Sequence, residues 1–327
     1  MMAGACTTKG WIWRFHDMRH IALTFLLAAF VSSCSSRTSR QTEAVRLSSQ
    51  SDAREAAAES SVGDSILSQT IYAPRDSARV VELLRMPIKG NDVLFYARQF
   101  IGVPYVASTL ERADPERLVV NLRQLDCTTL VETSLALALT KRQGGKTFAD
   151  YCLNLMRLRY WGGRMDCYLS RLHYFTWWMH DNMDKGLVEE VTNPKYFAAV
   201  INVDNHYMSA HPEKYRFLKG RKDRIDAIER LEQKYNGPDG RYLPAASTDL
   251  PKDKIGVVHD GDIIAIVTSK DGIDYSHLGF AIWGKEGKLH LLNASSIHHK
   301  VVEEPMTLRQ YLRKHPSSIG IRVLRLR

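Results

Sequence analysis

Three residues far apart in the chain have the side-chain types that a thiol–imidazole catalytic site requires: Cys127, His277 and Asn293. Cys127 stands at the start of an apolar segment that predicts a helix, where backbone N–H groups and the helix dipole stabilise a thiolate. A cysteine nucleophile needs an imidazole that takes and returns its proton, and the imidazole needs a partner that orients it. One interpretation is therefore that Cys127 is a nucleophile, His277 its base and Asn293 the amide that orients the base.

The two partners of Cys127 are predicted to lie on neighbouring strands. His277 begins the apolar segment 277–283, about 150 residues after Cys127, and Asn293 ends the segment 289–293. Residues 284–287 predict a hairpin turn between these strands. Because side chains on one face of neighbouring strands lie close together, His277 and Asn293 can meet.

The residue types alone leave other interpretations open. The chain has 12 histidines, and a single cysteine at a helix start is often only a small buried apolar residue. Cys127, Cys152 and Cys167 follow the N-terminal region, and an odd number in an oxidising compartment leaves at least one thiol outside an intramolecular disulfide. Whether Cys152 and Cys167 form a disulfide or are buried thiols is open at this point.

Length and composition predict one domain with a large insertion, or two small domains. The 327 residues are 44% hydrophobic and 25% charged, with a net charge of +9. This basic excess suits an acidic polymer or an anionic membrane surface, although a solvated basic surface is the commoner explanation. No zinc-ligand, P-loop or basic–aromatic pattern is present in the sequence, so we predict no metal, no other cofactor and no nucleic-acid partner.

The N-terminal region has the features of a secretory signal. Two basic residues precede the apolar run 21–31, which is too short to span a bilayer. The sequence Val31-Ser32-Ser33-Cys34 is similar to a bacterial lipobox, although an ordinary signal peptide with an incidental cysteine is the alternative. We therefore predict a signal segment at 1–34, lipidation of Cys34, a disordered tether at 35–66 and a lipid-anchored protein of the cell envelope with its main domain in the periplasm.

The remaining chain predicts an α+β fold, with helices first and an antiparallel sheet after them. The expected helices cover 77–84, 91–100 and a stretch from Asp126 or Cys127 to 143, and a short strand is expected at 119–120. A mostly helical insertion is expected at about 146–235, and a loop at 236–240 marks its end. The expected strands of the sheet cover 262–267, 277–283, 289–293 and 319–324.

Five short segments in a fixed order resemble the NlpC-type papain-like peptidoglycan hydrolases. They are 102–105 (GVPY), 125–132 (LDCTTLVE), 261–264 (GDII), 277–280 (HLGF) and 293–296 (NASS). Further matches at 159–163 (RYWGG), 171–175 (RLHYF) and 295–302 are similar to a subfamily of N-acetylmuramoyl-L-alanine amidases formerly catalogued as a domain of unknown function. The resemblance covers roughly 77–327. Related enzymes often carry histidine where this chain has Asn293.

The resemblance implies a papain-like core and a role for each matched residue. Cys127 attacks the amide carbon, His277 passes its proton to the leaving amine, and Asn293 orients His277. The Cys127 N–H and Tyr105 stabilise the oxyanion. Asp126 belongs to the substrate site, because in relatives that cut the stem peptide the residue before the cysteine holds a free amine.

The predicted insertion mixes aromatic rings with cations at Arg159, Tyr160, Arg171, His173 and Tyr174. Such groups stack on sugar rings and pair with the carboxylates of a peptide stem, so we predict that they bind substrate. The alternative is that they form the core of the helices. His173 is also a second possible base, outside the strand that carries His277.

The function implied by the resemblance is hydrolysis of the amide between N-acetylmuramic acid, including its 1,6-anhydro form, and L-alanine, in peptidoglycan or in muropeptides. An endopeptidase that cuts the stem peptide after γ-D-glutamate uses the same chemistry. A lipoprotein that binds peptidoglycan without cutting it is the alternative of another class, although it has no need of both Cys127 and His277.

Overall fold

The computed structural model describes residues 61–327. The predicted signal segment, Cys34 and the tether up to residue 60 lie outside the described residues. The chain divides into two compact units, Met1–Ser65 and Ile66–Arg327, and the second unit contains the elements described below. Residues 61–68 are helical, where the sequence predicts a flexible tether up to about 66. Among the described residues, no helix is both long and apolar enough to span a membrane.

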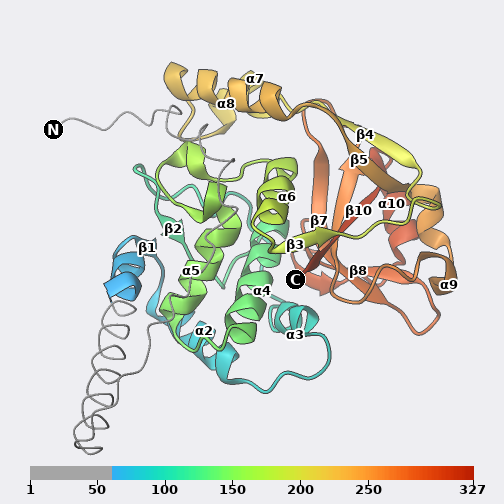
Figure 1. Ribbon diagram of the computed structural model, residues 1–327, viewed down its shortest axis with the longest axis horizontal. Coiled ribbons are helices and arrows are strands. Elements are labelled where there is room, and N and C mark those ends of the chain that lie inside the picture. Colours follow the sequence, from blue (N-terminus) through green and yellow to red (C-terminus); the bar gives the residue numbers. More distant parts are fainter. Residues whose placement is uncertain (1–60) are drawn as a thin grey trace, which may run out of the picture. The chain divides into compact units, whose positions relative to one another are not determined.

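Helices form the first part of the second unit, coloured blue to green in Figure 1. They are α2 (Pro74–Arg85), α3 (Asp92–Arg98), α4 (Cys127–Arg142), α5 (Phe148–Arg159) and α6 (Phe175–Asp184). α2 starts three residues before the predicted start at Ser77, because Pro74 occupies its first turn and the Asp76 carboxylate accepts a hydrogen bond from the Ala73 N–H at 3.1 Å. Asn91 caps α3 as predicted, accepting from the Leu94 N–H at 2.9 Å.

The sheet follows, and its strands pair in the order β4-β5-β10-β6-β7-β8-β9, with β3 paired to β10 as well. Their bounds are β3 Val188–Glu190, β4 Ala199–Val203, β5 Gly237–Pro244, β6 Ile263–Thr268, β7 Tyr275–Trp283, β8 Leu289–Ser295, β9 Lys300–Glu303 and β10 Ser318–Leu326. All these pairings are antiparallel. The antiparallel sheet predicted from the sequence is therefore present. A separate parallel pair joins β1 (Thr70–Ile71) to β2 (Leu118–Val119).

The predicted helical insertion is only partly helical. It contains α5, α6, α7 (Tyr207–Ala210), α8 (Lys222–Tyr235) and short 3-10 turns, and also the strands β3 and β4. β3 pairs with the C-terminal strand β10, so the insertion contributes to the main sheet. The predicted loop at 236–240 is the start of β5, which pairs with β4 through an irregular register near Pro238.

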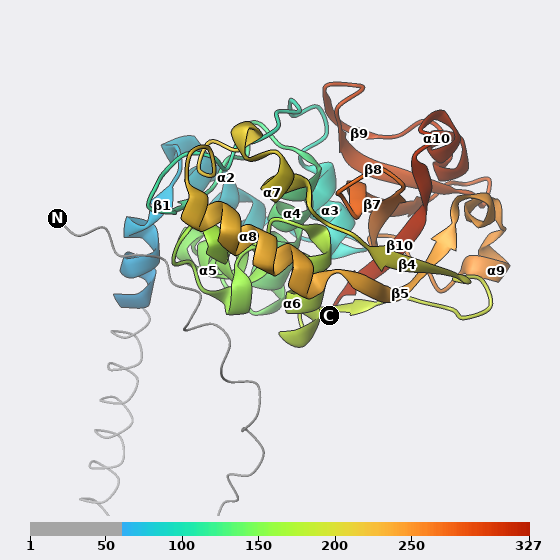
Figure 2. The same cartoon turned by 90° about the horizontal axis from the view of Figure 1, so that it is seen from above.

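The packing of α4 against the sheet positions the site. α4 contacts β7 and β8, and its residues Thr129–Thr140 are all buried. A second helix, α10 (Leu308–Lys314), packs on the sheet through Leu308, Tyr311 and Leu312, and it lies beside β8 and β10 (Figures 1 and 2). The N-terminus of α4 is thereby held against β7, where the sequence predicts His277.

Candidate active site

Cys127 is the first residue of α4, and Asp126 is its N-cap. The Asp126 Oδ1 accepts hydrogen bonds from the backbone N–H and the hydroxyl of Thr129, both at 2.8 Å. The Thr129 hydroxyl also accepts from the Asp126 N–H at 2.8 Å, which closes a capping box. This cap fixes the start of the helix and leaves the half-buried Cys127 thiol at the end of α4.

Tyr105 reaches the site because its segment bridges the sheet edge and the start of α4. The Tyr105 N–H donates to the His299 carbonyl at 2.9 Å, beside β9. On its other side, the Leu125 N–H donates to the Pro104 carbonyl at 3.0 Å, and the Val106 N–H donates to the Leu125 carbonyl at 3.1 Å. The GVPY segment, 102–105, is thus held against Leu125, two residues before Cys127.

His277 and Asn293 meet across β7 and β8 as the sequence predicts. The His277 Nε2 lies 3.0 Å from the Asn293 Oδ1, and Asn293 is fully buried. Because an amide oxygen can only accept, Nε2 carries the proton and Nδ1 of a neutral imidazole is left as the basic nitrogen. The backbone N–H of the next residue, Leu278, lowers the pKa of the Cys127 thiol, and α4 contacts β7, so the start of α4 lies near the strand that carries His277.

Gly279 allows β7 and β8 to approach closely next to the histidine. A Cβ at this position would lie 2.6 Å from the Leu292 carbonyl oxygen and 2.7 Å from a methyl carbon of Leu291. Only glycine fits between these backbones without a shift of the strand. The third residue of the HLG segment therefore supports the contact between His277 and Asn293.

Burial disfavours the charged forms of Cys127, His277 and Tyr105. It raises the pKa of the Cys127 thiol to about 11, with a further increase from Asp126, while the Leu278 N–H lowers it. Burial also lowers the pKa of His277, against the hydrogen bond to Asn293. The helix N-terminus alone would favour a thiolate, but burial and the adjacent carboxylate outweigh it. The pKa of Tyr105 is raised to about 12 by burial and by Cys127 and Asp126, so its hydroxyl remains a donor.

Two residues near the site are absent from the sequence prediction. The Tyr311 ring, from α10, stacks on the His277 ring with centroids 6.2 Å apart. Glu304 follows β9 and is buried, and it acts electrostatically on both His277 and Tyr311. The alternating segment after Lys300 is the signal that could have placed Glu304 on the face that carries Asn293.

The arginines of the predicted insertion are engaged in buried ion pairs with residues of the same fold. The Arg159 Nε lies 2.7 Å from the Glu132 Oε2 on α4, and its Nη1 donates to the Val119 carbonyl at 2.7 Å. The Arg171 guanidinium lies 3.1 Å from carboxylate oxygens of both Glu111 and Glu116. Both arginines are less than 10% exposed, which favours the alternative that they support the core.

The neighbouring aromatic residues have internal partners too. The Tyr160 hydroxyl donates to Glu116 at 2.9 Å, and the Tyr174 hydroxyl donates to Glu232 at 2.7 Å. The His173 Nε2 lies 2.8 Å from the Tyr168 carbonyl, and burial lowers the pKa of His173 to about 3. A histidine this weakly basic, bonded to a carbonyl, is poorly suited to act as the second possible base.

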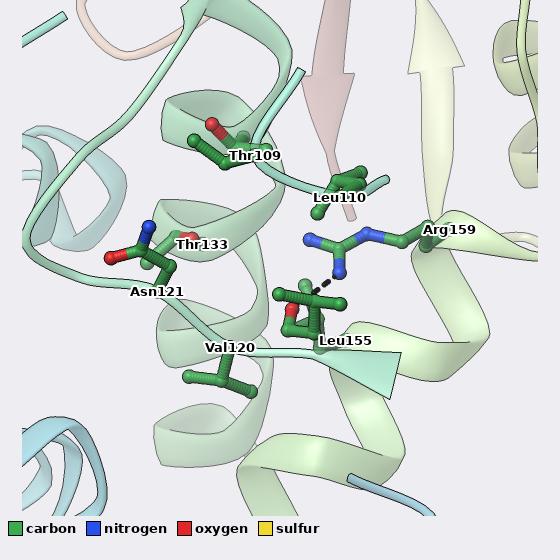
Figure 3. Close-up of a pocket in the computed structure, with 9 residues that line it drawn as sticks. Thr109, Leu110, Val120, Asn121, Thr133, Leu155 and Arg159 are labelled. Carbon is green, nitrogen blue, oxygen red and sulfur yellow. Dashed lines mark hydrogen bonds between the residues drawn. The ribbon is translucent and has the colours of Figure 1, made fainter. Parts of the chain in front are cut away.

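Figure 3 shows the surroundings of Arg159. Its guanidinium crosses from α5 to the backbone at Val119, next to Leu110 and Thr133, and these residues border a gap too narrow to hold a water molecule. This packing gives the guanidinium no open path to a ligand. Cys152, on the same helix α5, is a buried free thiol, so it is not joined to Cys167.

Comparison with known proteins identifies the family of this chain. Residues 96–321 match the AmiA-like family, described as N-acetylmuramoyl-L-alanine amidase-like. The chain belongs to the N-acetylmuramoyl-L-alanine amidase-like family. Its mixed α/β fold is shared with a crystal structure of an N-acetylmuramoyl-L-alanine amidase from Bacteroides uniformis, which is 38% identical, with a TM-score of 0.68 over 73% of this chain and 100% of that one.

Two other solved structures are similar to this member of the amidase-like family. A Bacteroides fragilis protein, described there as a xylanase candidate, is 41% identical, with a TM-score of 0.66 over 71% of this chain and 99% of that one. A Legionella pneumophila protein of the family DUF1460 is 22% identical, with a TM-score of 0.57 over 77% of this chain and 94% of that one. This similarity supports the fold alone. No curated protein matches the chain significantly. Membership of the amidase-like family implies a hydrolase with a peptidoglycan-type substrate.

Proposed function

We propose that the protein is a cysteine amidase with an NlpC-type, papain-like core that cuts the amide between N-acetylmuramic acid and L-alanine. The observation that carries this proposal is the arrangement around β7. Cys127 starts the helix that contacts β7, the backbone N–H of Leu278 on that strand lowers the pKa of its thiol, and the neighbouring His277 is held through Nε2 by Asn293. This is the order of groups that a thiol nucleophile, its base and an orienting amide require.

The reaction follows from the proton positions. As the Cys127 sulfur attacks the lactyl amide carbon, its proton passes to the His277 imidazole, and the carbonyl oxygen becomes an oxyanion. In this proposal the backbone N–H of Cys127 and the Tyr105 hydroxyl stabilise that oxygen. The C–N bond breaks as His277 gives the proton to the leaving L-alanine amine. Water, deprotonated by His277, then hydrolyses the thioester and frees the carboxylate.

Two other activities fit the site less well. An endopeptidase would use Asp126 to hold a stem-peptide amine, but the Asp126 carboxylate is engaged as the cap of α4. A glycosidase, which the description of the Bacteroides fragilis relative suggests, requires two carboxyl groups facing one glycosidic bond. Here the carboxylates nearest to Cys127 and His277 are the capping Asp126 and the buried Glu304.

Product analysis on defined substrates tests the proposal. Incubation with a muropeptide should release the sugar and expose a free L-alanine amine, and the 1,6-anhydro form should be among the substrates. A freed dipeptide indicates the endopeptidase instead, new reducing ends from xylan indicate the glycosidase, and binding without product indicates a non-catalytic lipoprotein. Any of these three results without the L-alanine product contradicts the amidase proposal.

We also propose that the enzyme is held at the cell envelope by a lipid on Cys34, with its amidase domain in the periplasm. The support is the apolar run 21–31 followed by a sequence similar to a lipobox. In this location the enzyme meets peptidoglycan or fragments released from it.

A further inference from the structure

Glu304 is a buried carboxylate on the sheet face that also carries Asn293, the hydrogen-bond partner of the proposed catalytic histidine. Its side chain has 0% exposure, and among the described residues neither carboxylate oxygen accepts a hydrogen bond. Most buried carboxylates are paired or hydrogen-bonded, because desolvation of a charge is costly. His298 Nε2, 3.3 Å away, is the ion-pair partner of Glu304 among the described residues, and a carboxylate this buried that accepts no hydrogen bond needs an explanation.

The strand register places Glu304 on the same face as the catalytic residues. Val302 pairs with Asn293, and the Glu304 N–H donates to the Leu291 carbonyl at 2.8 Å. Because side chains alternate along a strand, the Glu304 side chain lies on the face that also carries Asn293. Glu304, the residue after β9, thus places a carboxylate on the sheet face that carries Asn293.

Four ionisable side chains face His277 or Glu304 from the surrounding elements. Tyr311 comes from α10, His298 from the turn between β8 and β9, and Asp126 from the start of α4. His315, which follows α10, also acts on His277. The half-exposed His298 is the nearest to Glu304, with its Nε2 3.3 Å from the carboxylate.

The negative charge of Glu304 acts electrostatically on the proposed base. Glu304 is among the groups that favour the charged form of His277, whereas the strongest influences on Cys127 are burial, Asp126 and the Leu278 N–H. Proton transfer from the thiol to His277 creates a positive imidazolium in a buried place. A nearby negative charge stabilises that imidazolium.

We propose that Glu304 is a positioning residue whose carboxylate stabilises the His277 imidazolium that forms when Cys127 gives up its proton. The inference rests on the proposed function for the roles of Cys127 and His277. The competing explanation is that Glu304 only anchors the 296–299 turn through His298.

The test measures Cys127 reactivity directly, without any substrate of the amidase. The full-length protein and its Glu304→Gln variant are alkylated with iodoacetamide from pH 5 to 11, and the Cys127 peptide is quantified by mass spectrometry. Loss of the Glu304 charge should slow alkylation of Cys127 about tenfold at pH 7, because it should lower the pKa of His277 by about one unit. The two rates should converge near pH 11, where the thiol ionises without help from His277.

Three variants complete the comparison. Glu304→Asp keeps the charge and should keep most of the rate at pH 7. Glu303→Gln is the matched control, because Glu303 is exposed and pairs with Arg98 at 2.6 Å; it should alkylate as the wild type does. His298→Gln should stay within about twofold of the wild-type rate at pH 7. If Glu304→Gln does not fold, the uncharged Glu304→Met variant replaces it.

The outcomes separate this inference from the proposed function. An unchanged alkylation profile in Glu304→Gln overturns the inference, as does an equal loss at every pH shared with His298→Gln. Slower alkylation at pH 7 that converges at high pH supports it. Because no muropeptide is used, that result stands even if product analysis rejects the amidase.

Discussion

Replacement of Arg159 by alanine should destabilise the protein without changing its substrate preference. The ion pair between Arg159 and Glu132 is buried, with side chains 3% and 2% exposed. Removing one partner of such a pair leaves an uncompensated charge and costs about 3–5 kcal/mol of the free energy of unfolding. For a domain of this size each kcal/mol lowers Tm by roughly 2–4 °C, so Tm should fall by roughly 6–20 °C.

Thermal unfolding and kinetics together measure this prediction. Tm is recorded for the wild type, Arg159→Ala, and the control Arg157→Ala on the same helix, whose half-buried side chain donates only to the neutral Asn154 at 3.2 Å. The control should change the free energy of unfolding by about 1 kcal/mol or less. The ratio of kcat/KM for a free-acid and an amidated muropeptide should be the same in all three proteins.

A second comparison isolates the ion pair itself. Adding Glu132→Leu to Arg159→Met removes both charges, and this double variant should recover part of the stability lost in Arg159→Met alone. An Arg159→Ala protein with normal Tm and a selective loss of more than about tenfold on the free-acid substrate would refute the structural role. In that case Arg159 would contact the substrate, as the sequence first suggested.

Four further predictions concern the catalytic groups, acid stability and the anchor. Cys127→Ala should keep its Tm and lose at least about three orders of magnitude in turnover, and iodoacetamide should label Cys127 faster than Cys152, whose thiol is buried and has its pKa raised to about 12. Asn293→Ala should lower kcat/KM by roughly tenfold or more, because the His277 ring loses the partner of its Nε2. Burial lowers the pKa of His173 to about 3 in the folded protein, so below about pH 6.5 the unfolded chain binds a proton at this residue that the folded protein does not. Acidification from pH 7 to pH 4 should therefore lower the free energy of unfolding by about 3 kcal/mol, as measured by denaturant titration, and the loss should be smaller in His173→Gln. Cys34→Ser should abolish lipid labelling and move the protein to the soluble envelope fraction, and a wild-type N-terminus without lipid would contradict the anchor.

The elements nearest to the chemistry were predictable because their signals are local. The apolar run after Cys127 and the cap at Asp126 predict α4, and the structure starts that helix at Cys127. The apolar segments at 262–267 and 277–283 predict β6 and β7, and these strands are buried along their whole length and in their centre, respectively. The pairing of His277 with Asn293 followed from two strands joined by one short turn.

Other features depend on contacts between distant residues, and no local pattern contains them. β3 is three residues long and exists because β10, more than 120 residues later, pairs with it. Arg159 and Arg171 look like surface cations in the sequence, but their carboxylate partners lie 27 and 55 residues earlier in the chain. The sequence cannot distinguish an arginine that faces a substrate from one that faces such a partner.

The electrostatics of the site suggest how its reaction is controlled. Burial disfavours a charge on Cys127 and on His277, so the resting pair is a thiol and a neutral imidazole. Transfer of the proton from Cys127 to His277 leaves the net charge of the pair unchanged. Its free-energy cost is lowest when hydrogen-bond donors lie near the thiolate and a carboxylate lies near the imidazolium. The Leu278 N–H and Tyr105 lie on the sulfur side, and Glu304 lies on the imidazole side. In the proposed mechanism, the donors on the sulfur side and Glu304 on the imidazole side therefore lower the free-energy cost of the charge-separated pair.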